Sequence, residues 1–308
     1  MAQSDRQNGR GTVFPIVEAY GFPYNSSSPS AVETWKERSC PFAGGQCEKQ
    51  RQYGFGYCSV TYAATWDSGQ QRTYAVCDHR LDGPPVDWAV ADYFGDRPTT
   101  LVPEVMATSS PRLNIDYVAF ANDSSSPDGT SLIAIETQAI DLRGGGVGPA
   151  WKAWEENDVA NWRAYFTQEA QRKGRKDTVD YGVNTGNVYK RLGTQVAVKG
   201  EFLKQIEVPL YVVMQHSILQ QLRSRINFTS VGVDSAWDIT FAGFDYDGTL
   251  TPEGQLKLER VETVRTTLED YISAMTTSRE SSALREDFVA KVKRKVKAQP
   301  RDQTDPLF

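Results

Sequence analysis

Two carboxylates and an amide lie on neighbouring apolar segments that have the character of strands. Asp116 lies in the segment 113–118, and Glu136 and Gln138 lie in the apolar run 132–141. A polar, glycine-containing turn joins the segments, and positions 136 and 138 of a strand face the same side, so a meander would bring the three side chains together. Paired carboxylates on a rigid sheet suit Mg2+, which polarises a phosphodiester and lowers the pKa of an attacking water. Two solvated carboxylates beside a hairpin would leave the same pattern.

The cysteines form a second cluster, because all four lie within 38 residues with the spacing C-x6-C-x10-C-x18-C. Disulfides are uncommon in the cytosol, and four thiolates can close a tetrahedral site for zinc or iron. Turn residues between the first two cysteines suit a metal-binding knuckle. Such a site would be structural, because four thiolates leave no position open. Four ordinary buried thiols are the alternative. The candidate ligands are Cys40, Cys47, Cys58 and Cys77.

The composition predicts a cytoplasmic protein with no membrane association. The chain has 308 residues, 39% of them hydrophobic, and no apolar run approaches the ~20 residues of a membrane span. The first residues lack the apolar core of a secretory signal. The net charge is −5 but uneven, since residues 143–205 carry 11 basic against 7 acidic side chains and residues 1–142 carry 10 against 17. Nucleic-acid binding would therefore need a locally basic cleft.

Turn and loop segments rich in Gly, Pro and Ser divide the chain into three parts. Residues 1–35 are expected to be a polar N-terminal arm, 36–85 a cysteine module, and 86–308 the main domain. A meander followed by helix, strand and helix fits an α/β fold with a mixed sheet flanked by helices. The expected helices span 86–95, 151–173, 184–205 and 216–226, and the expected strands span 113–121, 131–140 and 210–214.

Several motifs, in order along residues 40–214, resemble those of the NotI and EagI restriction endonucleases. Residues 40–42, 57–60 and 77–80 resemble the metal-binding module, although Asp-His stands where that family has Pro-Asn. Ile135–Asp141 resembles the active-site strand Glu-Ile-Gln-x-x-Asp, and Ile115–Tyr117 resembles the preceding Asp-Trp. Residues 186–191, followed by Gln195 and the pair 199–200, resemble the helix Asn-Val-x-Lys-Arg.

The resemblance implies a type II restriction endonuclease with a PD-(D/E)xK nuclease core over 86–308, ending in a hairpin and helices, and an N-terminal four-cysteine module holding iron or zinc. It implies a homodimer that cuts double-stranded DNA at a GC-rich palindrome, beside a cognate DNA methyltransferase. Asp116 and Glu136 would bind Mg2+, Gln138 would occupy the usual lysine position, and Glu104 would be the upstream acidic residue. The implied DNA contacts are Arg143, Lys190, Arg191, Gln195 and the basic run 172–176.

Two other functions remain open from the residues. One is a non-catalytic DNA-binding protein that keeps the fold and the four-cysteine site. The other is a phosphatase of the haloacid-dehalogenase type, because Phe244–Leu250 matches its Asp-x-Asp-x-Thr loop. A hairpin with Asp247-Gly248 as its turn explains the same residues more simply.

Overall fold

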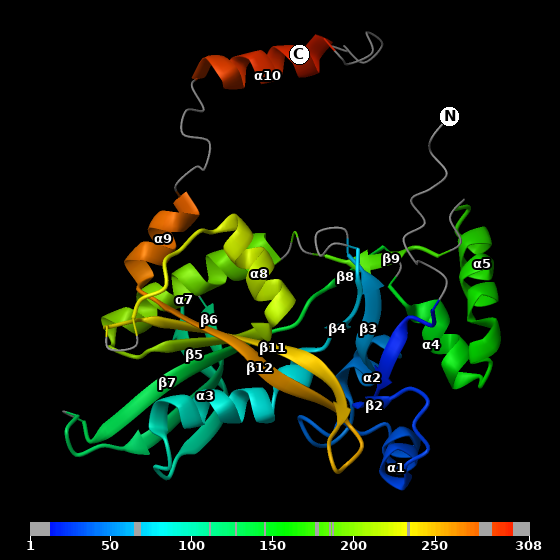
Figure 1. The fold of residues 1–308 in the computed structure, drawn as a ribbon, viewed down its shortest axis with the longest axis horizontal. Coiled ribbons are helices and arrows are strands. Elements are labelled where there is room, and N and C mark those ends of the chain that lie inside the picture. Colours follow the sequence, from blue (N-terminus) through cyan, green and yellow to red (C-terminus); the bar gives the residue numbers. More distant parts are fainter. Residues whose placement is uncertain are drawn as a thin grey trace.

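A six-stranded mixed sheet forms the centre of the computed structural model (Figure 1), with the order β12-β11-β10-β7-β6-β5. Strand β10 runs parallel to both β7 and β11, and the remaining pairs are antiparallel. The strands are β5 (Thr100–Ser109), β6 (Arg112–Asn122), β7 (Thr130–Gln138), β10 (Leu210–Gln215), β11 (Ile239–Leu250) and β12 (Leu256–Thr266). The structure describes residues 13–64, 69–110, 112–126, 128–144, 146–175, 179–184, 186, 188–232, 235–276 and 285–297.

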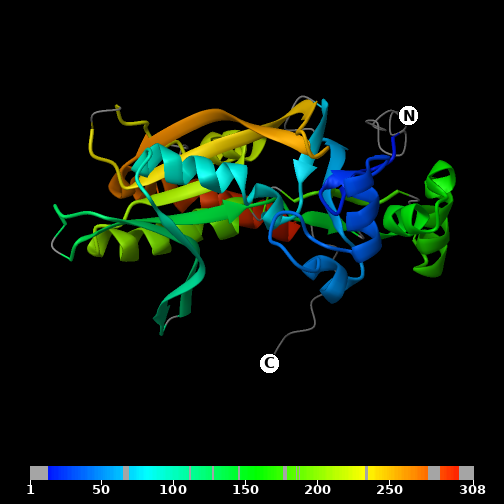
Figure 2. The same cartoon turned by 90° about the horizontal axis from the view of Figure 1, so that it is seen from below.

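Helices cover both faces of this sheet, so its central strands are apolar on both sides. Helices α7 (Gly193–Gln205), α8 (His216–Arg225) and α9 (Leu268–Thr276) bury apolar side chains with those of β7 and β10 that face them. Helix α3 (Pro84–Phe94) covers the opposite face, and Figure 2 shows α3 and α7 on opposite sides of β7. The expected mixed α/β sheet flanked by helices is confirmed.

A second, four-stranded sheet has the order β2-β1-β3-β4. It carries the cysteine segment, residues 40–77, which contains all four cysteines. Its strands are β1 (Ile16–Ala19), β2 (Phe22–Pro23), β3 (Tyr57–Ala63) and β4 (Gln71–Ala75), and α1 (Pro29–Glu37), α2 (Glu48–Tyr53) and the short helix η2 (Asp78–Leu81) connect them or follow them. The expectation of a loose arm over 1–35 is therefore wrong for residues 16–23, which form strands, and for residues 29–35, which begin α1. The strand β1 forms because it pairs with β3, which lies about forty residues later.

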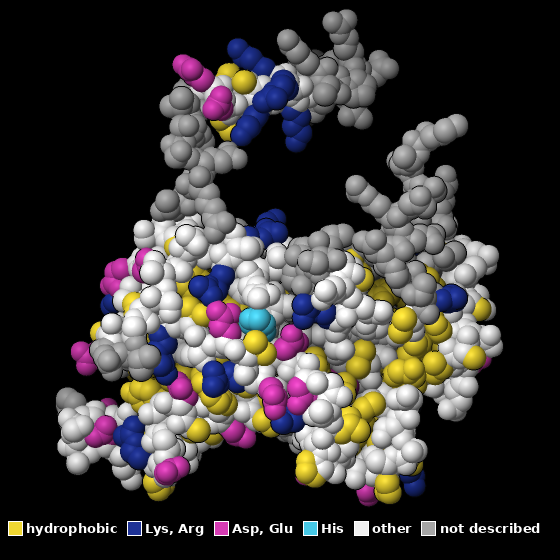
Figure 3. All heavy atoms as spheres, viewed as in Figure 1, with side chains coloured by type: hydrophobic (Ala, Val, Ile, Leu, Met, Phe, Trp, Pro, Cys, Tyr) yellow, Lys and Arg dark blue, Asp and Glu magenta, His cyan; other side chains and the backbone are white. Residues whose placement is uncertain are grey.

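The remaining elements differ from expectation in detail. The helix expected over 151–173 is two helices, α4 (Gly148–Glu155) and α5 (Trp162–Arg172), because Asn157 adopts a left-handed φ of 55° and the short helix η3 (Val159–Asn161) follows. The helix α7 is preceded by a π-helical turn, η4 (Val188–Leu192), and by the strand pair β8 (Leu142–Gly144) and β9 (Tyr181–Val183). A last helix, α10 (Arg285–Lys297), carries exposed Lys and Arg side chains in its second half (Figure 3). Among the described residues no helix is both long and apolar enough to cross a bilayer.

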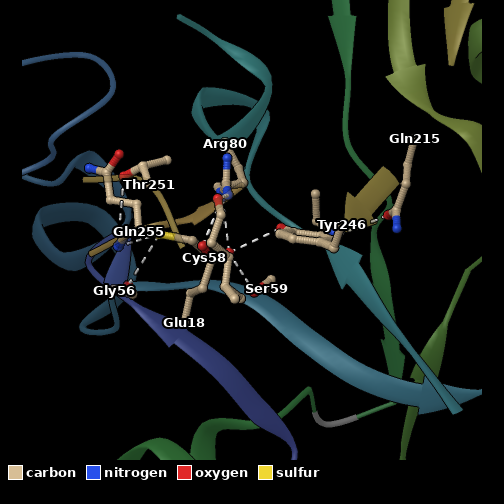
Figure 4. Close-up of polar contacts among 12 residues, drawn as sticks. Glu18, Gly56, Cys58, Ser59, Arg80, Gln215, Tyr246, Thr251 and Gln255 are labelled. Carbon is tan, nitrogen blue, oxygen red and sulfur yellow. Dashed lines mark hydrogen bonds and ion pairs between the residues drawn. The ribbon is translucent and has the colours of Figure 1, made fainter. Parts of the chain in front are cut away.

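A buried polar network joins the two sheets (Figure 4). The Arg80 Nε donates to both carboxylate oxygens of Glu18, at 2.9 and 3.0 Å. Ser59 Oγ and Tyr246 Oη donate to Glu18 Oε2, at 2.6 and 3.0 Å, and Arg80 also donates to the Leu256 carbonyl. The network thus connects β1, β3 and η2 to the hairpin β11–β12, and the cysteine segment is built into the main body.

Candidate active site

The carboxylates of Asp116 and Glu136 lie side by side where β6 and β7 stop pairing. The last pair there is Tyr117–Ile135, so positions 116 and 136 follow directly across the ladder. The Asp116 backbone N–H donates to Glu136 Oε1 at 3.4 Å, and the Thr137 N–H donates to Asp116 Oδ2 at 2.9 Å. Each carboxylate is therefore fixed by the other strand. This juxtaposition is the one that the meander in the sequence predicted.

The pair faces an open cleft of about 750 Å³. One wall comes from the β5–β6 hairpin, which projects from the body (Figure 2), and another from α7 and the turn η4. The third wall comes from η2 and the cysteine segment. Chain segments that are far apart in sequence thus converge on the carboxyl end of β7. The side chains that line the cleft include Phe42, Asp78, His79, Asp82, Glu104, Asp116, Glu136, Gln138, Arg191, Gln195 and Lys199.

Burial and repulsion from neighbouring carboxylates disfavour the negatively charged forms of Asp116 and Glu136 and raise the pKa of both. Burial, followed by the charge of Asp116, raises the pKa of Glu136 to about 7. Burial also raises the pKa of Asp116, although the Thr137 N–H opposes the shift. Hard oxygen ligands crowded into one place in this way favour the binding of a divalent cation, which neutralises the charge that burial penalises.

The other predicted catalytic residues also reach the cleft. Gln138 lies two positions after Glu136 on the same face, and its Nε2 donates to the Ala139 carbonyl at 2.6 Å. Glu104 stands opposite Asp116, between the pairs Pro103–Tyr117 and Val105–Ile115. Its φ of 53° is unusual for a residue other than glycine, and such strain persists only where surrounding structure enforces it.

Several residues of the cleft were not predicted. Lys199 is buried on α7 and donates to Glu136 Oε2. A lysine within the apolar stripe of Val196 and Leu203 was the available signal. Asp78 Oδ1 accepts from the Ala139 N–H at 2.8 Å, which ties η2 to the end of β7. His79 Nδ1 lies 2.7 Å from Asp82 Oδ2, and this hydrogen bond raises the pKa of His79.

The predicted DNA contacts divide into two groups. Arg191 and Gln195 line the cleft, and Arg191 Nη1 lies 3.5 Å from Asp141 Oδ2, which also lines it. Lys190 is exposed on η4 and is not among the residues that line the cleft. The side chain of Arg143, and Lys176 at the end of the basic run, lie outside the described residues. Within that run, Arg172 pairs with Glu169 and Arg175 with Asp180.

All four cysteines are buried around the knuckle 39–47 and the start of β3. Backbone N–H groups point at two of the sulfurs, from Ala43 to Cys40 at 3.4 Å and from Gly21 to Cys58 at 3.2 Å. Burial, opposed by the charge of Lys49, raises the pKa of Cys77 to about 11. In the described part of the chain, no three His, Cys, Asp or Glu side chains form a ready-made metal cage. The arrangement therefore does not support a preformed four-cysteine centre, although the knuckle and its N–H donors are present.

The phosphatase-like loop lies inside the hairpin β11–β12. The chain reverses at Thr251–Gln255, and Asp247-Gly248 instead forms an irregularity in β11, so the turn expected there is wrong. Asp245 Oδ1 accepts from Gln215 Nε2 at 2.9 Å, and Asp247 accepts from Thr249. Asp245 thus ties β11 to β10, and Asp247 holds the irregularity within β11.

No protein-family model matches the chain, and no curated protein matches it. The cleft itself is therefore the basis for assigning a function.

Proposed function

We propose that this protein is a Mg2+-dependent type II restriction endonuclease of the NotI and EagI kind. The observation that carries the proposal is the fixed pair Asp116 and Glu136, followed on the same strand by Gln138, at the end of a meander. Helix α7 then leads to β10, which is parallel to β7. This order of elements is the one expected of a PD-(D/E)xK core. A non-catalytic DNA-binding protein would have no need for a buried and a half-buried carboxylate held together with raised pKa values.

The residues of the cleft have distinct roles in the proposed reaction. Asp116 and Glu136 would hold Mg2+, which when bound polarises the scissile phosphate and activates water. Glu104, across from Asp116, would add a third carboxylate. Gln138 would orient the attacking water, because an amide can donate and accept hydrogen bonds but carries no charge. Arg191 and Gln195 would contact DNA from η4 and α7, with Lys190 and Arg143 at the rim.

The proposed enzyme is a homodimer, because two active sites must address the two strands of a palindrome. It would work in the cytoplasm, alongside a DNA methyltransferase that protects the same sequence. Reading a GC-rich site requires Arg or Lys in the major groove.

Digestion of DNA tests the function directly. Purified protein with Mg2+ and a genome of known sequence is expected to yield discrete fragments whose ends share one GC-rich palindrome. Bound but uncut DNA would favour the non-catalytic alternative. Fragment ends without a shared palindrome would overturn the specificity, and intact, unbound DNA would overturn the assignment.

We further propose that Cys40, Cys47, Cys58 and Cys77 hold one structural iron or zinc ion. Binding would draw the four buried sulfurs together and stabilise them as thiolates. Metal analysis of the purified protein is expected to find one ion per chain. Replacing any one cysteine by Ser should lower both metal content and thermal stability, whereas Ser39→Ala, beside the first cysteine, should change neither. A metal-free protein with unchanged stability would contradict the site.

A further inference from the structure

A buried lysine lies against the carboxylate pair. Lys199 is 8% exposed, lines the cleft, and donates through Nζ to Glu136 Oε2. Lysine is rarely buried unless a specific partner holds it there, because removing its charge from water is costly. Two basic side chains line the described part of the cleft, Lys199 and Arg191. Arg191 is exposed and lies beside Asp141. Among the described residues that line the cleft, Lys199 is therefore the cation next to the carboxylate pair.

The fold fixes this position from both sides of α7. Val196 and Leu203 lie three positions before and four after Lys199, on the buried face of the helix. Gly200 follows directly, and a Cβ there would lie 2.8 Å from the Leu268 side chain. The absence of a side chain at 200 thus lets α7 approach α9 closely. The helix is held against the sheet, and its lysine meets Glu136 near the end of β7.

Phosphodiester hydrolysis needs a positive charge at this place. The attacking water forms a new P–O bond, the bond from phosphorus to the 3′ oxygen breaks, and negative charge builds on the phosphoryl oxygens between these events. The water gives up a proton to solvent, and the leaving 3′ oxygen takes one from solvent. Position 138, where a lysine is usual in such cores, holds a neutral amide that is bonded to the Ala139 carbonyl. Nothing on β7 itself supplies the charge.

We propose that Lys199 supplies from α7 the cationic group that position 138 lacks, and that it stabilises the charge on the scissile phosphate. The inference rests on the proposed nuclease function. Lys199 exchanges no proton in this step, so its role is electrostatic. Its contact with Glu136 holds it within reach of the phosphate that the carboxylate pair would bind through Mg2+.

Relocating the charge tests this assignment. Three quantities are measured for each variant: the single-turnover cleavage rate at saturating Mg2+, the DNA affinity in Ca2+, and the midpoint of thermal unfolding. Lys199→Gln is expected to slow cleavage by about 100-fold or more, the effect of removing one preorganised charge donor, with DNA affinity nearly unchanged. The double variant Lys199→Gln/Gln138→Lys returns the positive charge to β7. Its cleavage rate should be at least about tenfold higher than that of Lys199→Gln alone. Lys204→Gln, on the same helix but paired with Asp238 outside the cleft, is the matched control and should cut normally.

Lys199→Arg keeps both the charge and the ion pair, so it remains informative if the glutamine variant does not fold. It is expected to cut within about tenfold of the wild-type rate. Near-normal cleavage by Lys199→Gln, or a slow variant that Gln138→Lys does not improve, would overturn the assignment. So would an arginine variant that folds but cuts no faster than the glutamine variant. A wild-type protein that cuts no DNA, or a Glu136→Gln variant that cuts normally, would instead overturn the proposed function.

Discussion

Asp116→Asn and Glu136→Gln are each expected to lower DNA cleavage by at least about 10³-fold, because the loss of a metal ligand removes several kcal/mol of charge stabilisation. Both substitutions preserve the shape of the side chain and keep most of its hydrogen bonds to the neighbouring strand. Each also removes a negative charge from a cleft that must accept phosphates. DNA affinity without Mg2+ should therefore be unchanged or higher.

The measurement is single-turnover cleavage of a cloned target, with binding followed in Ca2+. Glu253→Gln, an exposed carboxylate in the turn between β11 and β12, is the control and should cut at the wild-type rate. The two active-site variants should also fail to respond to higher Mg2+ concentrations in the way the wild type does. Near-normal cleavage by both variants would remove the carboxylate pair from the mechanism.

Arg80→Met is expected to lower the free energy of unfolding by about 3–5 kcal/mol, the usual cost of removing one partner of a buried ion pair. Glu18 is fully buried and would lose the Arg80 Nε that both of its carboxylate oxygens share. The contact from Arg80 to the Leu256 carbonyl would be lost at the same time. Urea unfolding followed by fluorescence measures the change.

Two comparisons isolate the buried charge. Arg97→Gln breaks an exposed pair with Asp123, whose closest atoms are 3.6 Å apart, and should cost at most about 1 kcal/mol. Adding Glu18→Gln to Arg80→Met removes the stranded carboxylate and should restore part of the loss. An Arg80→Met protein as stable as the wild type would show that the network contributes little to holding the two sheets together.

The parts of the site that could be predicted from the sequence depend on local pattern. Alternating and continuous apolar runs gave the meander and β10, and the meander alone placed Asp116 opposite Glu136. The knuckle 39–47 follows from its glycines and proline. These features depend on neighbours within one or two strands, which the order of residues directly encodes.

The parts that escaped prediction depend on contacts across the fold. Residues 16–23 form two strands of only four and two residues around Gly21, too short to signal a sheet, and their pairing to each other and to β3 makes them strands. The apolar stripe of α7 indicates that Lys199 is buried, but its contact with Glu136 depends on how α7 crosses the sheet, which the stripe does not encode. Arg80 appeared only as the end of a cysteine motif, yet its partners lie 62 and 176 positions away in the chain.

The Glu18 network joins residues far apart in the sequence, and this separation determines when the network can form during protein synthesis. Glu18 receives its hydrogen bond from Tyr246 across 228 positions, so this contact cannot form until β11 has left the ribosome. Contacts of such long range slow folding, because the chain must close large loops before any stabilisation is gained. The wall of the cleft formed by η2 is anchored to the same network. A nascent chain would thus stay without a finished cleft until β11 and β12 have been made, and the proposed DNA-cutting activity would not appear before that point.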